Sequence, residues 1–416
     1  METDMIKTVQ HELLMIALVF IFGLLAIKIA ERIRIPDVAL YILIGILVGP
    51  SGFNIITQPI NSVAYQFIVI LGSILILFEG GRAIQTSVLK NVWISILLLA
   101  VLGVFVTAAA VAVSSYYLLG IPILYAVLLA SVISSTDPAT LIPVFKQVHV
   151  KEKVRQTVES ESAFNDATGS ILTFTVLGVI LGETNLSVTA AAWSFVQEAI
   201  GGLLVGSLIG IIGLFLISNY KMGVFRNYAP IASFVVAIIS YLVAVQFHAS
   251  GFMATFVAGI LSGNPQLLRT KITNETNTSI LEFSETITLM MRTLIFIFLG
   301  TQVNFSVLLN YWWQSILIVL IFMFVARPLT VLICTLPDRK AKWSWREIIF
   351  MFWVRETGVI PAALSGMIVA TGVKYADAIA SVTFVAILMT IVIQASTTGF
   401  VAKKLGLVIE QGKSTN

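Results

Sequence analysis

Two aspartates lie inside long apolar segments of this sequence, each among hydroxyl or amide side chains. Asp137 follows three hydroxyl residues, and Asp166 comes four residues after Ser162 and directly after Asn165. Carboxylate and hydroxyl oxygens are the ligands that small, hard cations prefer. An ionisable side chain at mid-membrane costs about 2.5–3.5 kcal/mol and usually has a function. The two segments therefore predict a buried site for a cation, a proton or both.

The first segment also predicts a broken helix. It reads Ser134-Ser135-Thr136-Asp137-Pro138-Ala139-Thr140-Leu141-Ile142-Pro143. Its two prolines each remove a backbone donor and clash with the preceding turn, so the helix should be interrupted. Unpaired backbone groups at membrane depth are tolerated only where they face protein or a water-filled cavity. We expect Thr136 and Asp137 to bind a cation at this break. The alternative is a proline-kinked helix in which Asp137 caps the second half, and the two roles are compatible.

In the second segment, helical spacing places Ser162 and Asp166 on one face and Glu161 and Asn165 on an adjacent one. Asp166 lies about nine residues, or about 13 Å, from the nearest basic loop, which is near mid-membrane. A carboxylate there either keeps its proton or exchanges it for a cation. A site in which H+ and a cation exclude each other is the minimum requirement for exchange. The alternative is that Asp166 is a structural hydrogen-bonding residue in a helix bundle.

Three arginines, Arg292, Arg327 and Arg355, also fall within apolar segments and need partners. Glu161 and Glu356 are the candidate carboxylates for structural ion pairs. Removing one member of a buried pair costs about 3–5 kcal/mol. The stretch Arg355-Glu356-Thr357-Gly358-Val359-Ile360-Pro361 predicts a second interrupted helix.

Composition identifies the class of protein. The chain has 416 residues, of which 58% are hydrophobic and 11% charged, against about 25% charged in average soluble proteins. The excess apolar surface must face lipid. Apolar segments of sufficient length predict thirteen transmembrane helices near residues 11–30, 37–52, 63–80, 92–117, 122–145, 158–181, 189–218, 227–246, 250–264, 280–302, 311–335, 346–370 and 375–402.

The basic residues predict the orientation of these spans. With thirteen spans, most of the 25 lysines and arginines fall on one side of the membrane, which the positive-inside rule assigns to the cytoplasm. We call it the basic side. It carries Lys28, Arg32, Arg34, Arg82, Lys90, Lys146, Lys151, Lys153, Arg155, Lys221, Arg226, Arg269, Lys271, Arg339, Lys340, Lys342, Arg346, Lys403, Lys404 and Lys413. The N-terminus is therefore expected outside and the C-terminus in the cytoplasm.

Other classes of protein are not favoured. The net charge of +4 comes from loop residues at the membrane, which argues against a nucleic-acid partner. The single cysteine, Cys334, allows no internal disulfide framework. The first apolar segment is followed, not preceded, by its positive cluster, so it is interpreted as a retained span. No phosphate loop, metal-histidine pair or nucleophile elbow is present, and we expect neither an enzyme nor a cofactor.

These segments resemble the NhaP-type Na+/H+ antiporters of the monovalent cation:proton antiporter superfamily. The resemblance is carried by residues 136–145 and 161–166, and it is supported by Ile35-Pro36-Asp37, Leu43-Ile44-Gly45, Gly49-Pro50, Gly251-Phe252-Met253-Ala254, Ala326-Arg327-Pro328 and residues 358–364. It implies an all-α fold of thirteen transmembrane helices, with inverted repeats and two broken, crossing helices, like the NhaA antiporter fold. It also implies a homodimer in the plasma membrane.

The resemblance implies a division of the chain as well. Residues 1–90 and 185–305 would form a dimerisation domain, and residues 91–184 and 306–404 a transport domain. Residues 405–416 would be a short cytoplasmic tail. Asp166 would be the essential ion- and proton-binding carboxylate, and Asp137, Thr136, Ser162 and Asn165 would help to form the site for the monovalent cation. The pair Asn165-Asp166 would mark electroneutral exchange. Glu79 matches an ion-site glutamate of some members; alternatively it is an interfacial acid beside Arg82.

The sequence departs from the family pattern at one position. Members commonly have an arginine directly before the glycine of span twelve, paired with the equivalent of Glu161. Thr357 stands there in this chain, and Arg355 lies two residues earlier, about 200° away around a regular helix. The sequence therefore does not identify the arginine that pairs with Glu161.

We predict a secondary active transporter that exchanges Na+ or Li+ for H+ by alternating access. K+/H+ exchange on the same fold is the first alternative, since oxygen ligands serve both ions. A cation channel with the same broken helices, which would pass net current, and a cation sensor are the alternatives from other classes.

Overall fold

The computed structural model describes residues 2–33, 35–57, 62–182, 188–218 and 223–409. Arg34, Lys221 and Lys413, which enter the orientation argument, lie outside these residues. The helices are α1 Glu2–Ile33, α2 Asp37–Val48, α3 Val63–Ala83, α4 Thr86–Ala100, α5 Leu102–Leu119, α6 Ile123–Ile133, α7 Pro138–Gln147, α8 Glu152–Ile180, α9 Val188–Ile217, α10 Ala229–Gln246, α11 Gly251–Gly263, α12 Asn274–Thr301, α13 Phe305–Asn310, α14 Trp312–Ile321, α15 Arg327–Thr335, α16 Trp345–Trp353, α17 Val359–Thr371, α18 Ala376–Met389 and α19 Ser396–Lys404. Short 3-10 turns lie at Arg226–Tyr228 and Pro265–Leu268.

The all-helical class is confirmed, and the helices stand where the apolar segments predicted them. Nine helical segments in the described ranges are long and apolar enough to cross a membrane: Val9–Ile33, Val63–Ala83, Thr86–Leu119, Glu152–Ile180, Trp193–Ile217, Arg226–Gln246, Asn274–Thr301, Trp312–Thr335 and Ala376–Lys404. Four shorter apolar helices are Asp37–Val48, Ile123–Ile133, Gly251–Gly263 and Val359–Thr371. The number of membrane crossings, thirteen, stays a prediction.

Both expected interruptions are present. α6 ends at Ile133 and α7 begins at Pro138, while α16 ends at Trp353 and α17 begins at Val359. Two long helices contain a π-helical turn instead of a break, at Phe322–Ala326 between α14 and α15 and at Thr390–Ala395 between α18 and α19. The first of these directly precedes Arg327 and Pro328. Since a proline removes one helical hydrogen bond, the wider turn accommodates it without ending the helix.

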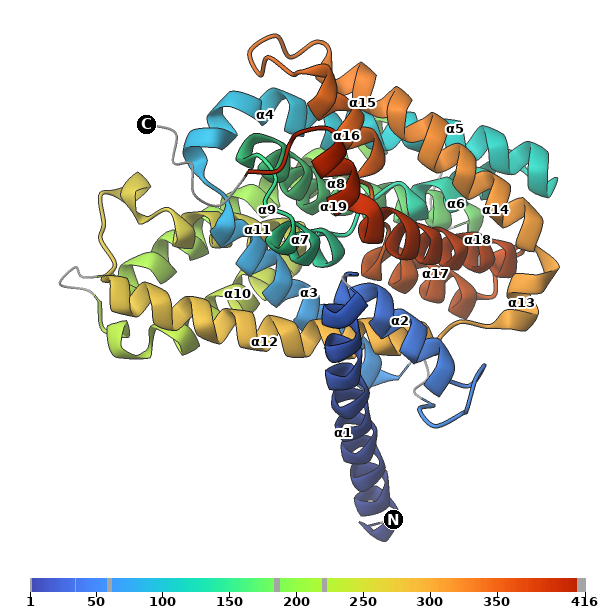
Figure 1. Cartoon of the computed structure of the whole chain (residues 1–416), viewed down its shortest axis with the longest axis horizontal. Coiled ribbons are helices and arrows are strands. Elements are labelled where there is room, and N and C mark those ends of the chain that lie inside the picture. Colours follow the sequence, from blue (N-terminus) through green and yellow to red (C-terminus); the bar gives the residue numbers. More distant parts are fainter. Residues whose placement is uncertain (1, 34, 58–61, 183–187, 219–222, 410–416) are drawn as a thin grey trace.

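The helices pack as two groups (Figure 1). One group contains α1, α2, α3 and α9 to α12, in which α11 packs on α3 and α9, and α12 packs on α2 and α3. The other contains α4 to α8 and α14 to α19, in which α4 packs on α8, α5 on α6, and α18 on α14 and α17. The groups meet where α8 contacts α9 and α11, α3 contacts α7, and α12 contacts α17.

Glycines permit a close approach of α3 and α11 beside the second group. A side chain at Gly259 or Gly263 would overlap the backbone of Phe78 or Arg82 in α3. Small residues let membrane helices approach at backbone distance. The helix that carries Glu79 is thereby fixed against α11, and its next residue, Gly80, faces Ile142 of α7.

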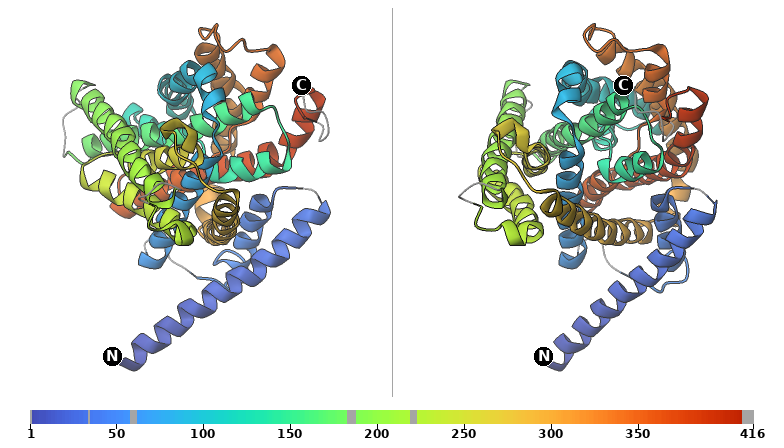
Figure 2. Two further views of the ribbon diagram at one scale, coloured as in Figure 1. Left: turned by 90° about the vertical axis from the view of Figure 1, so that its left-hand side faces the viewer. Right: turned by 60° about the vertical axis from the view of Figure 1, so that its left-hand side comes forward.

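The first helix lies largely outside this packing. Figure 2 shows α1 projecting from the rest of the helices at its N-terminal end. Several of its large apolar side chains are exposed, including Leu13, Leu24 and Leu25. Such a surface needs lipid or another protein chain to cover it.

Candidate functional site

The two broken helices meet at Asp137. The Asp137 N–H donates to the carbonyl of Glu356 at 2.9 Å, and Oδ2 of Asp137 accepts the N–H of Val359 at 3.0 Å. The same carboxylate oxygen accepts the Thr140 hydroxyl at 3.2 Å. Asp137 thus binds the open N-terminus of α17, where the helix dipole favours a negative charge.

Gly358 makes this crossing possible. A side chain at this position would overlap the Asp137 carboxylate. Glycine therefore lets the unwound segment before α17 lie directly against Asp137. The prolines and the resemblance suggested that two interrupted helices cross. These contacts show that crossing.

Asp166 lies in α8, close to the first break, and is fully buried. The Ser135 hydroxyl and the Asp137 carboxylate are the polar groups that act on it electrostatically. Within the described residues, neither carboxylate oxygen of Asp166 has a hydrogen-bond partner, and the same is true of the hydroxyls of Ser135 and Ser162. Buried oxygens of this kind carry a large desolvation cost unless something compensates them. A dehydrated cation or a proton would do so.

Asn165 has a different role from its neighbour. Its Oδ1 accepts the Thr136 N–H at 3.0 Å, and its Nδ2 donates to the Thr136 hydroxyl at 2.8 Å. The side chain therefore satisfies the unwound backbone before Asp137 and fixes the break against α8. Asn165 and Thr136 hold each other, while Asp166 and Ser162 present oxygens to the site.

Glu161 pairs with Arg327. The two groups form a bidentate contact with N–O distances of 2.5 and 3.1 Å, and both side chains are almost completely buried. Arg327 also donates to the carbonyls of Met351 at 2.8 Å and Val354 at 3.1 Å. One arginine thus neutralises Glu161 and binds the open C-terminal end of α16. The partner of Glu161, which the presence of Thr357 left open, is therefore Arg327 at the start of α15.

The other two arginines are held differently. Nη2 of Arg355 donates to the carbonyl of Ser134, and its guanidinium lies 4.9 Å from the ring centre of Phe322. Arg355 therefore binds the C-terminal end of α6 through a carbonyl. Arg292 in α12 pairs with Asp37 of α2 at 2.8 Å, so neither expected glutamate is its partner.

Glu79 is buried in α3 and interacts electrostatically with Arg82 of the same helix. Arg82 also donates to Asn277 Oδ1 at 3.1 Å. The electrostatic interaction with Arg82 agrees with the structural alternative. The packing of the adjacent Gly80 on α7 places Glu79 at the boundary between the two helix groups. This position is also compatible with an ion-site glutamate.

Sequence reasoning missed one carboxylate. Glu356 was considered only as a partner for an arginine, yet it is fully buried, and among the described residues neither of its oxygens has a hydrogen-bond partner. Arg327 and Asp137 are the charged groups that act on it. Its position inside an interrupted apolar segment was the available signal. It joins Asp137 and Asp166 as a third carboxylate at the crossing.

Two polar residues of the second π-helical turn were also missed. The Thr390 hydroxyl accepts the N–H of Thr357 at 3.1 Å, and Gln394 donates to the carbonyl of Trp353 at 2.7 Å. They satisfy backbone groups that the break exposes. The sequence indication for both residues was their polar side chains in an otherwise apolar span.

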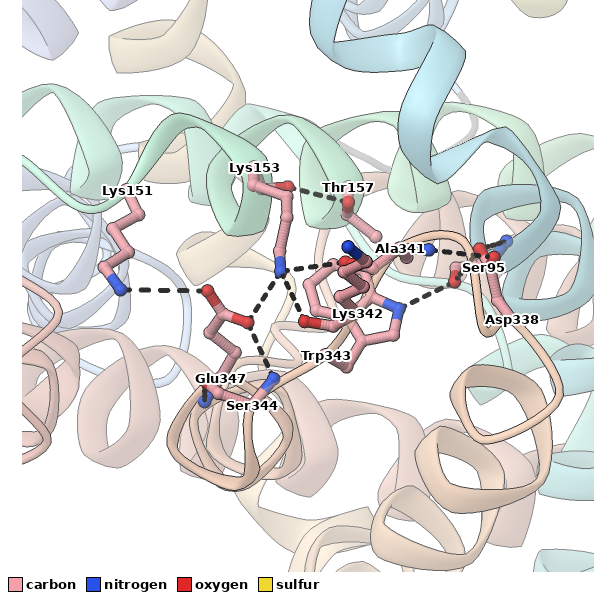
Figure 3. Close-up of polar contacts among 10 residues, drawn as sticks. All are labelled: Ser95, Lys151, Lys153, Thr157, Asp338, Ala341, Lys342, Trp343, Ser344 and Glu347. Carbon is pink, nitrogen blue, oxygen red and sulfur yellow. Dashed lines mark hydrogen bonds and ion pairs between the residues drawn. The ribbon is translucent and has the colours of Figure 1, made fainter.

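A polar network on the basic side joins α8, which carries Asp166, to α4 and α16 (Figure 3). Lys153 of α8 binds Glu347 of α16 at 2.7 Å and lies 4.3 Å from the ring centre of Trp343. Trp343 donates to Ser95 of α4 at 2.8 Å, and Ser95 donates to Asp338 at 2.7 Å. The network links α4, α8 and α16 at one end, so these helices are held as one unit.

Comparisons with known proteins agree with this geometry. The family described as "Sodium/hydrogen exchanger, transmembrane" matches residues 16–404. The chain is similar to the K(+)/H(+) antiporter NhaP of Alkalimonas amylolytica, at 29% identity over 97% of this chain and 68% of that protein. It is also similar to Na(+)/H(+) antiporter 1 of Methanocaldococcus jannaschii, at 29% identity over 94% of this chain and 95% of that protein. The solved structure of the sodium proton antiporter MjNhaP1 from M. jannaschii at pH 8 matches with a TM-score of 0.78 and 27% identity, covering 94% of this chain and 97% of that one.

Proposed function

The chain belongs to the sodium/hydrogen exchanger family, and from that premise we propose that it exchanges a monovalent cation for H+ at Asp166. The observation that carries the proposal is the cluster of buried oxygens at the helix crossing, on Asp166, Ser162 and Ser135, which have no hydrogen-bond partner within the described residues. They are ligands of the type that a small cation requires, beside a carboxylate that must otherwise be protonated to be buried.

The contacts of the site residues support the following proposed roles. Asp166 binds either the cation or the proton, and Ser162 supplies a further oxygen. Asp137 adds negative charge while it binds the N-terminus of α17, and Thr136, held by Asn165, fixes the break. Glu79 is proposed as an additional acid at the boundary between the helix groups. The pairs of Glu161 with Arg327 and of Arg292 with Asp37 are structural, and Arg355 binds the end of α6.

The two helix groups suggest how the site reaches both sides of the membrane. We propose that α4 to α8 and α14 to α19 form a transport domain, and that α1 to α3 and α9 to α12 form a dimerisation domain of a homodimer. The transport domain would shift against the other domain and carry Asp166 with it. A naked carboxylate is penalised in an apolar environment, so only the protonated or cation-loaded form moves easily. That penalty couples the two fluxes.

Sodium is proposed as the main substrate, with Li+ as its analogue, and the exchange as electroneutral. Relatives named as Na(+)/H(+) antiporters support this choice, as does the neutral Asn165 before Asp166. Potassium is the second candidate, because a relative of 29% identity is named a K(+)/H(+) antiporter. The proposed location is the plasma membrane, with the basic side in the cytoplasm.

The test is exchange in proteoliposomes that contain a pH-sensitive dye and an imposed proton gradient. Addition of Na+ or Li+ should reverse the dye quenching, and clamping the membrane potential should leave the rate unchanged. Reversal by K+ alone would move the proposal to potassium. Net current without a proton gradient would contradict exchange and favour a channel.

A further inference from the structure

A cavity of about 350 Å³ lies between the two helix groups. Its lining comes from α3, α9, α10 and α11 on one side and from α8 and α17 on the other; it includes Ser73, Ser170, Phe174, Glu198, Tyr241 and Met367. Since a water molecule occupies about 30 Å³ of liquid volume, the cavity has room for a hydrated ion. It is positioned between the parts that would move during transport.

The cavity reaches the ion site from the side opposite the basic loops. Ser170 and Phe174 follow Asp166 by four and eight residues in α8, so they lie about 6 and 12 Å farther along the helix, on roughly the same side. Ile360 also lines the cavity. It directly follows Val359, whose N–H binds Asp137. The inner end of the cavity is therefore about one helical turn from Asp166.

Among the described residues, Glu198 of α9 is the one acidic residue in the lining. Its backbone carbonyl accepts the Ser250 N–H at 3.0 Å, which fixes this part of α9 against the start of α11. The side chain is half-buried, and no ion pair to it is present among the described residues. The other lining residues that the structure describes are apolar or neutral polar. An ionisable residue in such a place is costly and is usually functional.

We propose that Glu198 recruits the transported cation into this cavity before the cation reaches Asp166. A single carboxylate on low-dielectric walls focuses the field and raises the local concentration of cations. The proposal rests on the proposed function, because it assigns an entry residue for the same substrate. It predicts that Glu198 affects the binding of cations from this side and leaves the turnover at saturation unchanged.

The first test is transport by the Glu198→Gln variant in vesicles sorted for orientation. When the cation is added on the cavity side at low ionic strength, its apparent KM should rise about three- to tenfold with an unchanged maximal rate. The difference should shrink in about 1 M inert salt, where the screening length is about 3 Å. From the basic side KM should not change. Glu198→Asp should restore the KM of the original protein, and Asp377→Asn, an exposed acid at the start of α18, is the matched control.

The second test does not depend on transport. Met367 lines the cavity and is 45% exposed, and the single natural cysteine, Cys334, is buried. In the Met367→Cys protein, we compare the reaction rates of the cationic trimethylammonium-ethyl methanethiosulfonate and of the neutral methyl methanethiosulfonate. The ratio of the cationic to the neutral rate should be higher with Glu198 present than in the Met367→Cys/Glu198→Gln protein. An unchanged ratio of the two rates would overturn the proposal for Glu198. Silence of the unsubstituted protein with every cation would instead overturn the proposed function.

Discussion

Asp166→Asn is expected to reduce cation-dependent proton movement in proteoliposomes to the level of protein-free liposomes. The amide has nearly the shape of the carboxylate but can neither bind a proton in exchange for a cation nor neutralise the cation's charge. Asp166 is fully buried, and within the described residues its oxygens have no other partner, so no neighbouring group compensates for the loss. The measurement is dye dequenching on addition of Na+, Li+ and K+.

The fold should survive this change. Removing a buried charge without an ion-pair partner is not expected to destabilise the protein, so Asp166→Asn should melt at or above the temperature of the unsubstituted protein. Ser162→Ala, which removes one proposed oxygen and keeps the carboxylate, is the matched control and should retain exchange with a raised KM. Full exchange by Asp166→Asn would refute the mechanism.

Glu161→Gln is expected to destabilise the protein by about 3–5 kcal/mol, because it leaves a buried charge without its partner. The loss should exceed that of Arg327→Gln. Arg355 interacts electrostatically with both Arg327 and Glu161, so removal of Glu161 leaves two buried guanidinium groups acting on each other. Removal of Arg327 leaves Glu161 with Arg355 nearby. Thermal unfolding in detergent measures both variants.

The double variant Glu161→Gln/Arg327→Gln tests whether the two residues act as a pair. Its destabilisation should be clearly smaller than the two single effects added together. Arg292→Gln is the control. It breaks the Arg292–Asp37 pair between α12 and α2, whose side chains are 13% and 11% exposed and therefore less buried than those of Arg327 and Glu161. Strict additivity would contradict the assignment of a buried, coupled pair. Equal effects of the two single changes would contradict the role given to Arg355.

Much of the architecture could be predicted from local sequence rules. Runs of apolar residues located the helices, and Pro138 and Pro361 marked both interruptions, because proline acts on its own backbone neighbours. Asp137 and Asp166 stood out because charged groups are rare in lipid. These inferences needed no knowledge of which helices are in contact.

The pairing of side chains could not be predicted in the same way. Arg327, which binds Glu161, is separated from it by 166 positions, and a π-helical turn directly precedes it. Arg355 and Glu356 looked suited to an ion pair, yet the unwound segment directs Arg355 to a carbonyl and leaves Glu356 among the site carboxylates. Glu198 lies inside a predicted span, but its proposed role could not be predicted, because that role depends on a cavity lined by five other helices.

The most direct test of the account is proton release on cation binding by the purified protein in weakly buffered detergent solution. If a cation and a proton exclude each other at Asp166, addition of the transported ion should release about one proton per bound cation, and Asp166→Asn should release none. Cation binding without proton release, or equal release by Asp166→Asn, would contradict exchange at this carboxylate.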